Sequence, residues 1–288
     1  AAAIARADDG APVQTIWSRE EDVKHDFYRP ACVSRFNAGF DAQGKLTAWH
    51  NASAGQAIVH QVLERLFGMP GAGPDKTTSE GAFDQAYEFA NARIGHKIVE
   101  LPVPIGFWRA VGHSHQAFFK EGFIDEAAHA AGQDPVAFRA ALLQKHPRHL
   151  AVLNRCAQLA GWGKPPAPAP DGAKTARGIA LHQSFGSIVA QAAEVSVAAD
   201  KKIRVHRVVC VVDCGTPINP NLIRQQMESG IVFGLSAALY GRITIEKGQV
   251  QQGNFHDVPA LRINECPVIP KPAIGARKKK GRAKNDHN

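Results

Sequence analysis

The chain has 288 residues, 44% of them hydrophobic, so it is long enough to bury one or two globular cores. Residues 271–288 hold seven basic residues and one acid, and therefore six of the eight net positive charges. That tail has no periodic apolar residue to organise a site, so we expect a disordered basic tail over 270–288 and no nucleic-acid partner. The sequence also lacks an apolar run of about 18 residues, which excludes a predicted membrane span.

The first part of the chain predicts a strand, a short helix and a hairpin. PVQTIW at 12–17 has strand character, and Ser18 with Glu21 forms a capping box for a short helix. Apolar and polar residues alternate over 32–54 around a turn at 42–44, which predicts a β-hairpin.

Residues 99–128 predict a loop that leads into a helix. Prolines and a glycine at 102–106 end a strand-like stretch, the chain turns through 107–112, and an amphipathic helix follows. Arg109 stands just before that helix, where it either binds a phosphate or carboxylate or forms an ion pair with Glu121 or Asp125. We interpret the histidines of GHSH at 112–115 as loop residues, because two residues on one turn supply no full metal coordination set.

A proline-rich segment divides the chain. Before it, Asp134 and Pro135 predict the start of helices that run to residue 160. The segment KPPAPAPDGAKTA at 164–176 has the composition of a linker, and the alternating stretches at 177–185, 192–213 and 242–254 predict strands. We therefore expect an α+β fold with two mixed lobes, over 1–163 and 177–269. Each lobe should turn its ligand-binding end towards the gap between them, because interfaces between lobes are common ligand sites.

A second loop and helix follow the strands. Asn219 is a good N-cap and Pro220 suits the first helical position, so a helix should run from there towards residue 240. Gly230 and Gly234 make one of its faces smooth, which indicates either tight helix packing or the close approach of a ligand. Both loop–helix junctions aim backbone N–H groups and a positive helix end at an anion, as a phosphate-bearing cofactor requires.

Several motifs in order resemble one enzyme family. They are SREEDVKHDFYRPA, FDAQGKLTAW, GFWRAVGHSHQAFFKEGFIDE, VVDCGTPINPNLIRQQMESGIVFGLSAALYG and GQVQQGNFHDVPALRINECPVI. In this order they are similar to the molybdopterin-binding large subunit of the isoquinoline 1-oxidoreductase and xanthine dehydrogenase–aldehyde oxidase family, over about residues 12–269.

The resemblance implies a cofactor, a reaction and a partner. The cofactor is molybdenum held by molybdopterin, commonly as the cytosine dinucleotide, and the substrate is an aldehyde or N-heterocycle oxidised with water-derived hydroxide. Electrons leave through iron–sulfur clusters. No CxxC occurs among the five cysteines, so the clusters are expected on a small [2Fe-2S] subunit. The compartment is left between the cytoplasm and, if an export signal has been lost, the periplasm.

The resemblance also implies cofactor-binding residues, but no catalytic residue and no metal ligand. One group is the loop 107–112, a second lies in the Q-x-E-x-G helix start, and a third lies in LHQSFGS. These residues are Phe107, Trp108, Arg109, Ala110, Val111 and Gly112, then Gln226 and Gly230, then Phe185 and Gly186.

Two motifs of the family are not found. Its members carry a GGGFGRR-type loop before the segment that resembles residues 1–22, and a GGxGE loop, with the catalytic glutamate, after the segment that resembles 261–269. Glu265 lies in NECP rather than in a glycine loop, so that role is not transferred to it. We therefore expect a truncated copy that is inactive alone; the alternative is a non-catalytic scaffold for subunit interaction.

Overall fold

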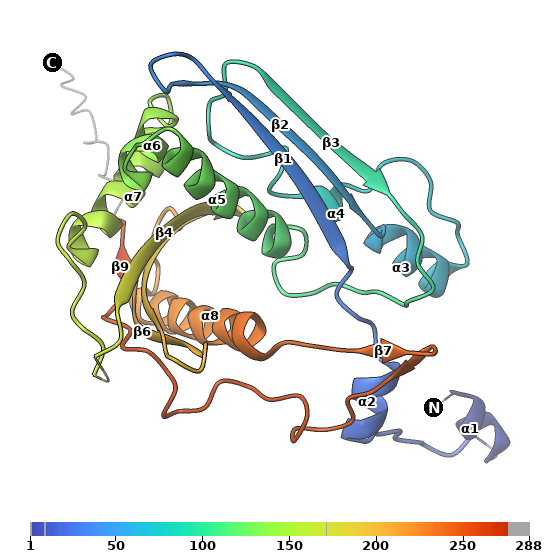
Figure 1. Ribbon diagram of the computed structural model, residues 1–288. Helices are drawn as coiled ribbons and strands as arrows, with labels where there is room; N and C mark the ends of the chain where they lie inside the picture. Colours follow the sequence, from blue (N-terminus) through green and yellow to red (C-terminus); the bar gives the residue numbers. More distant parts are fainter. Residues whose placement is uncertain (1, 9, 171, 276–288) are drawn as a thin grey trace, which may run out of the picture. The chain divides into compact units, whose positions relative to one another are not determined.

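The structure, a computed structural model, describes residues 2–8, 10–170 and 172–275 (Figure 1). The chain forms two compact units. The smaller comprises the chain up to Phe27 together with Phe233–Leu261, and the larger comprises Tyr28–Val232 together with the chain from Arg262.

The smaller unit holds two short helices and a short hairpin: α1 (Ala2–Ala7), α2 (Arg19–His25), β7 (Ile245–Glu246) and β8 (Gln249–Val250). Helix α2 begins as predicted, because Ser18 Oγ accepts a hydrogen bond from the N–H of Glu21 at 3.3 Å. The strand expected at 12–17 is wrong. Those residues form no regular element, and Ile16 and Trp17 are exposed, since strand character without a pairing partner does not make a strand.

The larger unit begins with a three-stranded sheet in the order β1 (Cys32–Phe40), β2 (Leu46–Gly55) and β3 (Ala92–Ile98). The predicted hairpin is confirmed as the antiparallel pair β1–β2. Strand β3 runs parallel to β2, so the connection between them crosses over and carries α3 (Ile58–Phe67) and α4 (Lys76–Ser79).

A four-stranded sheet has the order β4 (Thr175–Ser184), β5 (Ser187–Val197), β6 (Ile203–Asp213) and β9 (Ala273–Ile274). The antiparallel strands β4, β5 and β6 occupy two of the three stretches predicted after the linker. In the third stretch, 242–254, only the two-residue strands β7 and β8 form, so that prediction was largely wrong. Strand β9 pairs in parallel with β6, which corrects the tail expected from residue 270: Ala273 and Ile274 are in a sheet. The rest of that tail, 276–288, lies outside the described residues.

Three helices join the two sheets: α5 (His113–Ala130), α6 (Pro135–Ala141) and α7 (Pro147–Ala160). Asp134 caps α6 as predicted, accepting from the N–H groups of Val136 and Ala137. Helix α7 covers β5 and β6, while α5 contacts both β1 and β4 (Figure 1). One buried apolar cluster therefore includes Trp49 of the first sheet, Ile124 of α5 and Leu181 of the second sheet. The fold is mixed α and β, as predicted.

The last long helix, α8 (Pro220–Tyr240), begins where the sequence predicts, with Asn219 Oδ1 accepting from the N–H groups of residues 221 and 222. Most apolar side chains of α8 are not buried: within the described chain, Ile231 is its one buried residue. A methyl group added at Gly234 would meet no atom within 4 Å. Tight helix packing therefore does not explain that glycine.

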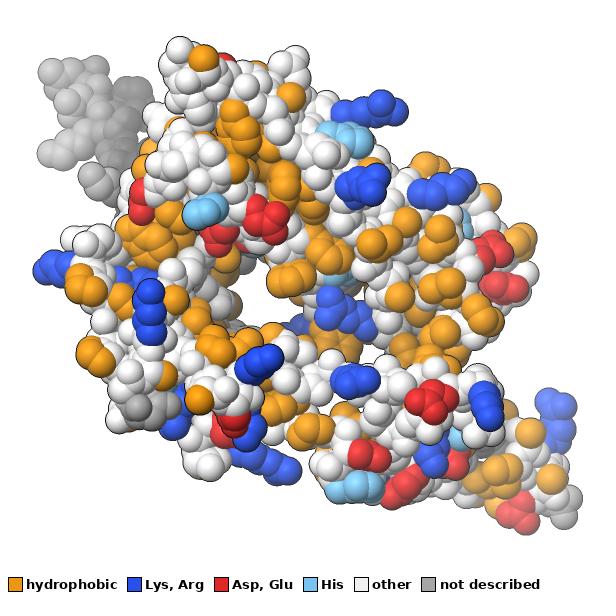
Figure 2. Space-filling model, in the orientation of Figure 1, with side chains coloured by type: hydrophobic (Ala, Val, Ile, Leu, Met, Phe, Trp, Pro, Cys, Tyr) orange, Lys and Arg blue, Asp and Glu red, His pale blue; other side chains and the backbone are white. Residues whose placement is uncertain are grey.

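The surface mixes side-chain types. Figure 2 shows apolar side chains over the drawn face with basic and acidic side chains between them. Within the described residues, no helix is both long enough and apolar enough to cross a bilayer.

A buried carboxylate links α5 to its neighbours. Glu121 Oε2 accepts hydrogen bonds from Arg139 Nε at 3.0 Å, from the Tyr87 hydroxyl at 3.2 Å and from the N–H of Leu181 at 2.8 Å. Arg139, whose side chain is 0% exposed, also contacts Asp125 at 2.6 Å. Glu121 and Asp125, the two carboxylates considered as ion-pair partners of Arg109, thus bind Arg139.

Helix α5 starts in a tightly packed place. A Cβ on Gly112 would lie 2.3 Å from the carbonyl oxygen of Thr77, so only glycine fits there. Gly122, in the same helix, has open space around the equivalent position.

Arg139→Met should lower the free energy of unfolding by about 3–5 kcal/mol, because it leaves Glu121 buried without its cation. Arg148→Met, which breaks the more exposed pair with Asp213, is the control and should cost about 1 kcal/mol or less. Urea unfolding followed by circular dichroism measures both. Equal losses in the two variants would contradict the central role of Glu121.

Gly112→Ala should destabilise the protein by about 1–3 kcal/mol through the clash with Thr77. Gly122→Ala should instead stabilise it by up to about 1 kcal/mol, since alanine favours a helix interior. Thermal unfolding of the pair checks this contrast, and a stable Gly112→Ala protein would refute the packing argument.

Candidate functional site

The loop 106–112 has an unusual backbone, and hydrogen bonds to the preceding residue anchor its start. Ala110 and Val111 adopt left-handed φ angles of 70° and 49°, which cost a non-glycine residue about 1–3 kcal/mol each. The N–H of Val111 donates to the carbonyl of Trp108 at 2.8 Å, which closes the turn. Fully buried Ile105 anchors the entry, because its N–H donates to Gln61 and its carbonyl accepts from Arg65. Strain of this kind gathers at ligand-binding loops.

The loop presents an aromatic ring and a cation. Phe107 is 56% exposed and Arg109 is exposed. Arg109 Nη2 lies 3.9 Å from the position that a Cβ on Gly230 would take. The loop before α5 and the smooth face of α8 therefore meet, although they are far apart in the sequence. Gln226 is exposed one turn earlier on α8 and makes no side-chain hydrogen bond within the described chain.

The turn between β4 and β5 approaches the N-terminal end of α5. Phe185 and Gly186 have φ angles of 47° and 82°, a pair that suits a two-residue hairpin turn. Phe185 is 72% exposed, and its ring centroid lies 5.3 Å from that of His113, at an interplanar angle of 68°. Because His113 directly follows Gly112, this turn lies beside the end of the loop 107–112, whose Arg109 in turn approaches Gly230 of α8.

A buried polar cluster beneath these segments was missed from the sequence. His113 and His115, expected as loop residues, are buried in the first turn of α5. His113 Nδ1 lies 3.0 Å from His182 Nε2, and Lys120 Nζ lies 3.1 Å from His182 Nδ1. The prediction of loop histidines was wrong because the loop ends at Gly112 and α5 already begins at His113. The one signal in the sequence was the place of His182 in a predicted strand, just before the turn at 185–186.

Burial governs the protonation of this cluster. Desolvation, with the nearby charge of Lys120, lowers the pKa of His182 to about 2. Burial also lowers the pKa of His113, although the carboxylates of Asp84 and Glu80 oppose the shift. Both imidazoles are therefore neutral at pH 7.

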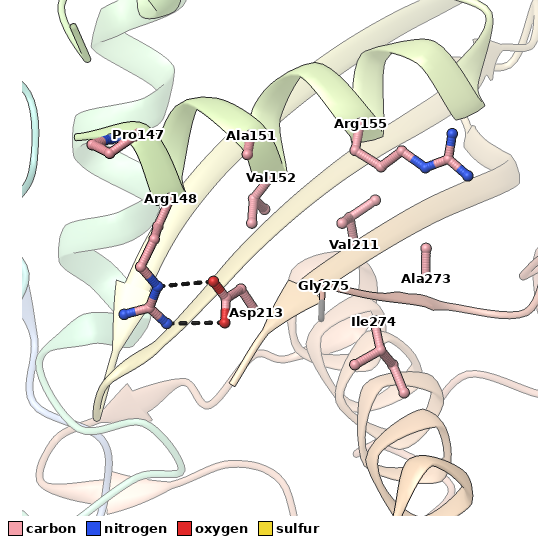
Figure 3. Close-up of a pocket in the computed structure, with 10 residues that line it drawn as sticks. All are labelled: Pro147, Arg148, Ala151, Val152, Arg155, Val211, Asp213, Ala273, Ile274 and Gly275. Carbon is pink, nitrogen blue, oxygen red and sulfur yellow. Dashed lines mark hydrogen bonds and ion pairs between the residues drawn. The ribbon is translucent and has the colours of Figure 1, made fainter. Parts of the chain in front are cut away.

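A pocket of about 540 Å³ lies elsewhere in the larger unit, between α7 and the strands β6 and β9 (Figure 3). Arg148 and Asp213 form a bidentate ion pair at one end, with both distances 2.9 Å. None of the ten predicted cofactor-binding residues lines this pocket. We therefore do not identify it with the loop site.

The loop site suits an anionic organic cofactor. It combines the Arg109 guanidinium, an exposed aromatic ring and a helix face without a side chain at Gly230. Within the described residues, no cluster of three histidine, cysteine, aspartate or glutamate side chains could hold a metal ion directly. A metal carried by an organic cofactor needs no such cluster, so the donors present fit a molybdopterin.

The cysteines form no cluster site. All five are free thiols, and burial raises the pKa of Cys156 and Cys210 to about 12. Cys210 is buried, whereas Cys214 is half-buried.

Comparisons with known proteins agree with this fit. Residues 1–142 and 163–267 each match a family model described as a molybdopterin cofactor-binding domain. The isoquinoline 1-oxidoreductase subunit beta of Brevundimonas diminuta is 32% identical over 274 residues, 93% of this chain and 34% of that protein. A membrane-bound aldehyde dehydrogenase [pyrroloquinoline-quinone] of Gluconacetobacter polyoxogenes is 28% identical over 93% of this chain and 37% of its own length.

Solved structures show the same fold. Quinoline 2-oxidoreductase from Pseudomonas putida 86 has a TM-score of 0.73 at 13% identity, covering 96% of this chain and 58% of that one. The Cu,Mo-CO dehydrogenase has a TM-score of 0.71 at 10% identity, covering 95% and 58%.

The chain spans about a third of the length of the two curated relatives described. The two family models and the relatives agree with the motifs quoted from the sequence. The chain belongs to the family of molybdopterin cofactor-binding domains, and it is similar to the beta subunit of isoquinoline 1-oxidoreductase.

Proposed function

We propose that this chain provides part of a molybdopterin-binding surface, formed by residues 107–112, the turn at 185–186, and Gln226 with Gly230 of α8. The observation that carries the proposal is the approach of Arg109 to Gly230, 3.9 Å from a Cβ position there, which joins two of these segments. When bound, the cofactor supplies a redox-active metal that activates water and accepts electrons from the substrate.

The chain's own residues have binding and orienting roles in this proposal. Arg109 offers a charge-assisted hydrogen-bond donor to a phosphate of the cofactor, in its dinucleotide or mononucleotide form. Gly230 leaves room beside that guanidinium, and Phe107 and Phe185 offer exposed aromatic surface. None of the ten candidate residues is a carboxylate able to take a proton. We therefore assign cofactor binding, and not turnover, to these residues.

For the whole protein we propose oxidation of an aldehyde or aromatic N-heterocycle, with a small iron–sulfur subunit as electron acceptor. The names of similar proteins support this substrate class: isoquinoline 1-oxidoreductase, nicotinate dehydrogenase and aldehyde oxidoreductase. The location of the protein in the cytoplasm or the periplasm stays a prediction.

A subunit-interaction scaffold is the second candidate. Helix α8 favours it, because Leu222 and Phe233 are exposed on a helix that buries only Ile231 in the described chain. In this second proposal, another polypeptide covers these side chains. Molybdenum content distinguishes the two functions.

Arg109→Ala should weaken cofactor retention about 10- to 100-fold, the loss expected for a hydrogen bond to a charged group. The measurement is molybdenum per chain by mass spectrometry, with pterin fluorescence, after expression with the cofactor pathway. Arg93→Ala, at an exposed arginine of β3, is the control and should retain the metal. Wild-type protein without molybdenum, or an Arg109→Ala variant that retains it fully, would refute the proposed function.

Gly230→Leu and Gly234→Leu form a matched pair on α8. The first side chain extends towards Arg109, whereas a Cβ at Gly234 meets nothing within 4 Å. We expect Gly230→Leu alone to lower the molybdenum content, by at least about tenfold if it removes the Arg109 contact. Equal losses in both variants would show that helix substitution, and not the approach of Arg109, is responsible.

A further inference from the structure

Four polar side chains form a chain of contacts through the larger unit, beneath the loop site. Lys120 Nζ of α5 is 3.1 Å from His182 Nδ1 of β4, and His182 Nε2 is 3.0 Å from His113 Nδ1 of α5. His113 Nε2 in turn faces Glu80 Oε2 at 4.0 Å. This row of contacts therefore has an ionisable group at each end, Lys120 and Glu80, and two neutral imidazoles between them.

The chemistry of the donors fixes the order in which the hydrogen bonds of this row are donated. An ammonium group only donates, so His182 Nδ1 has to accept and carries no hydrogen. The proton of His182 is then on Nε2 and is donated to His113 Nδ1, which leaves the proton of His113 on Nε2, facing Glu80. A neutral lysine would allow the opposite order, so the charge of Lys120 decides both tautomers.

Lys120 is only 6% exposed, and its surroundings both favour and oppose its positive charge. Its Nζ lies over the Tyr87 ring, 5.5 Å from the centroid, in a cation–π arrangement. Burial lowers its pKa, and Arg139 adds to the shift, while the carboxylates of Glu121 and Asp84 oppose it.

The histidine pair is closed in by the backbone of Gly81. A Cβ at Gly81 would lie 2.9 Å from His182 Cε1 and 3.0 Å from His113 Nδ1, and its φ is +89°. No side chain fits there, so the imidazoles have little freedom to leave this arrangement.

The pair joins two of the segments assigned to the cofactor. His113 follows Gly112 at the end of the loop, and His182 comes three residues before Phe185, whose strained backbone needs support from its surroundings. The ring of Phe185 rests on His113, with centroids 5.3 Å apart.

We propose that Lys120 is a positioning residue that fixes the tautomers of His182 and His113, and so holds the loop 107–112 and the turn 185–186 together. Its relevance to the cofactor rests on the proposed function, but the tautomers and the link between the segments do not. A test on cofactor-free full chain therefore separates the two: failure of molybdenum binding leaves the ring assignments intact, and wrong ring assignments leave molybdenum binding intact.

The test compares Lys120→Met with Lys120→Arg, which keeps a cationic group that only donates. Ring ¹⁵N shifts report the tautomers, and hydrogen exchange reports opening of 107–112 and 184–187. We expect both rings protonated on Nε2 in the wild type and in Lys120→Arg. Lys120→Met should mix the tautomers and raise exchange about 10- to 100-fold, the loss expected for a hydrogen bond to a charged group.

A lysine that only fills space predicts otherwise, because methionine has a similar volume and would leave both rings and both segments as they are. Lys145→Met, at an exposed lysine, is the control and should change neither readout. Wild-type His182 protonated on Nδ1, or Lys120→Met protein with unchanged shifts and exchange, would overturn the proposal. If Lys120→Met does not fold, the wild-type ring assignment alone decides.

The pH dependence gives a second test. The groups around the pair are Lys120, Glu121 and Arg139 from the helices, Glu80 and Asp84 from the loop after α4, and His149 from α7. The unfolded histidines bind protons below pH 6.5, whereas folded His182 stays neutral down to about 2. The contribution of His182 to stability is therefore fully present above pH 6.5 and is lost as the pH falls below it, where this group alone makes the unfolding constant rise up to about tenfold per pH unit.

His182→Gln should give a shallower pH dependence than the wild type, since it removes that titration while the surrounding carboxylates remain. Urea unfolding between pH 7 and pH 4.5 measures the slopes. Imidazolium ring shifts at His182 near pH 6, or equal slopes in the two proteins, would contradict the proposed arrangement.

Discussion

The carboxylate of Glu121 is the interaction on which the rest of the larger unit depends. One oxygen accepts from the guanidinium of Arg139, from the hydroxyl of Tyr87 and from the backbone N–H of Leu181. The last bond matters most for the site, because it attaches α5 to β4 at one defined register. Lys120 precedes Glu121 and His182 follows Leu181, so the bond that fixes the register also sets the lysine opposite the histidine.

Helix α5 transmits this register to the loop. The same rigid helix that carries Lys120 and Glu121 begins at His113, directly after the strained turn at Ala110 and Val111. Because a helix is stiff over this length, the position of its first turn follows from contacts made two turns later. The candidate site is thus assembled from loops, but its geometry is set by a buried polar network that the ligand would not touch.

Local signals predicted much of this fold. Caps at Ser18, Asp134 and Asn219, the hairpin over 32–54 and the alternating strands after the linker are local patterns, and the structure has them. The family too follows from ordered motifs. Strand β3 and the β9 pairing were not predicted, because parallel pairing joins segments whose sequences do not mark each other. The histidine cluster was missed for the same reason: His113 and His182 become neighbours only through tertiary contacts. The ten cofactor residues remain predictions from resemblance.

The parallel pairing of β9 with β6 has a consequence for the order of folding. These strands are separated by residues 214–272, and only two residues of β9 take part. Closing a long connection costs entropy before any contact is gained, and two paired residues return little of it. The hairpins β4–β5 and β5–β6 close over short turns and need no such search. The three antiparallel strands should therefore form the early part of this sheet, with β9 completing its edge as a late step that is the first to open again.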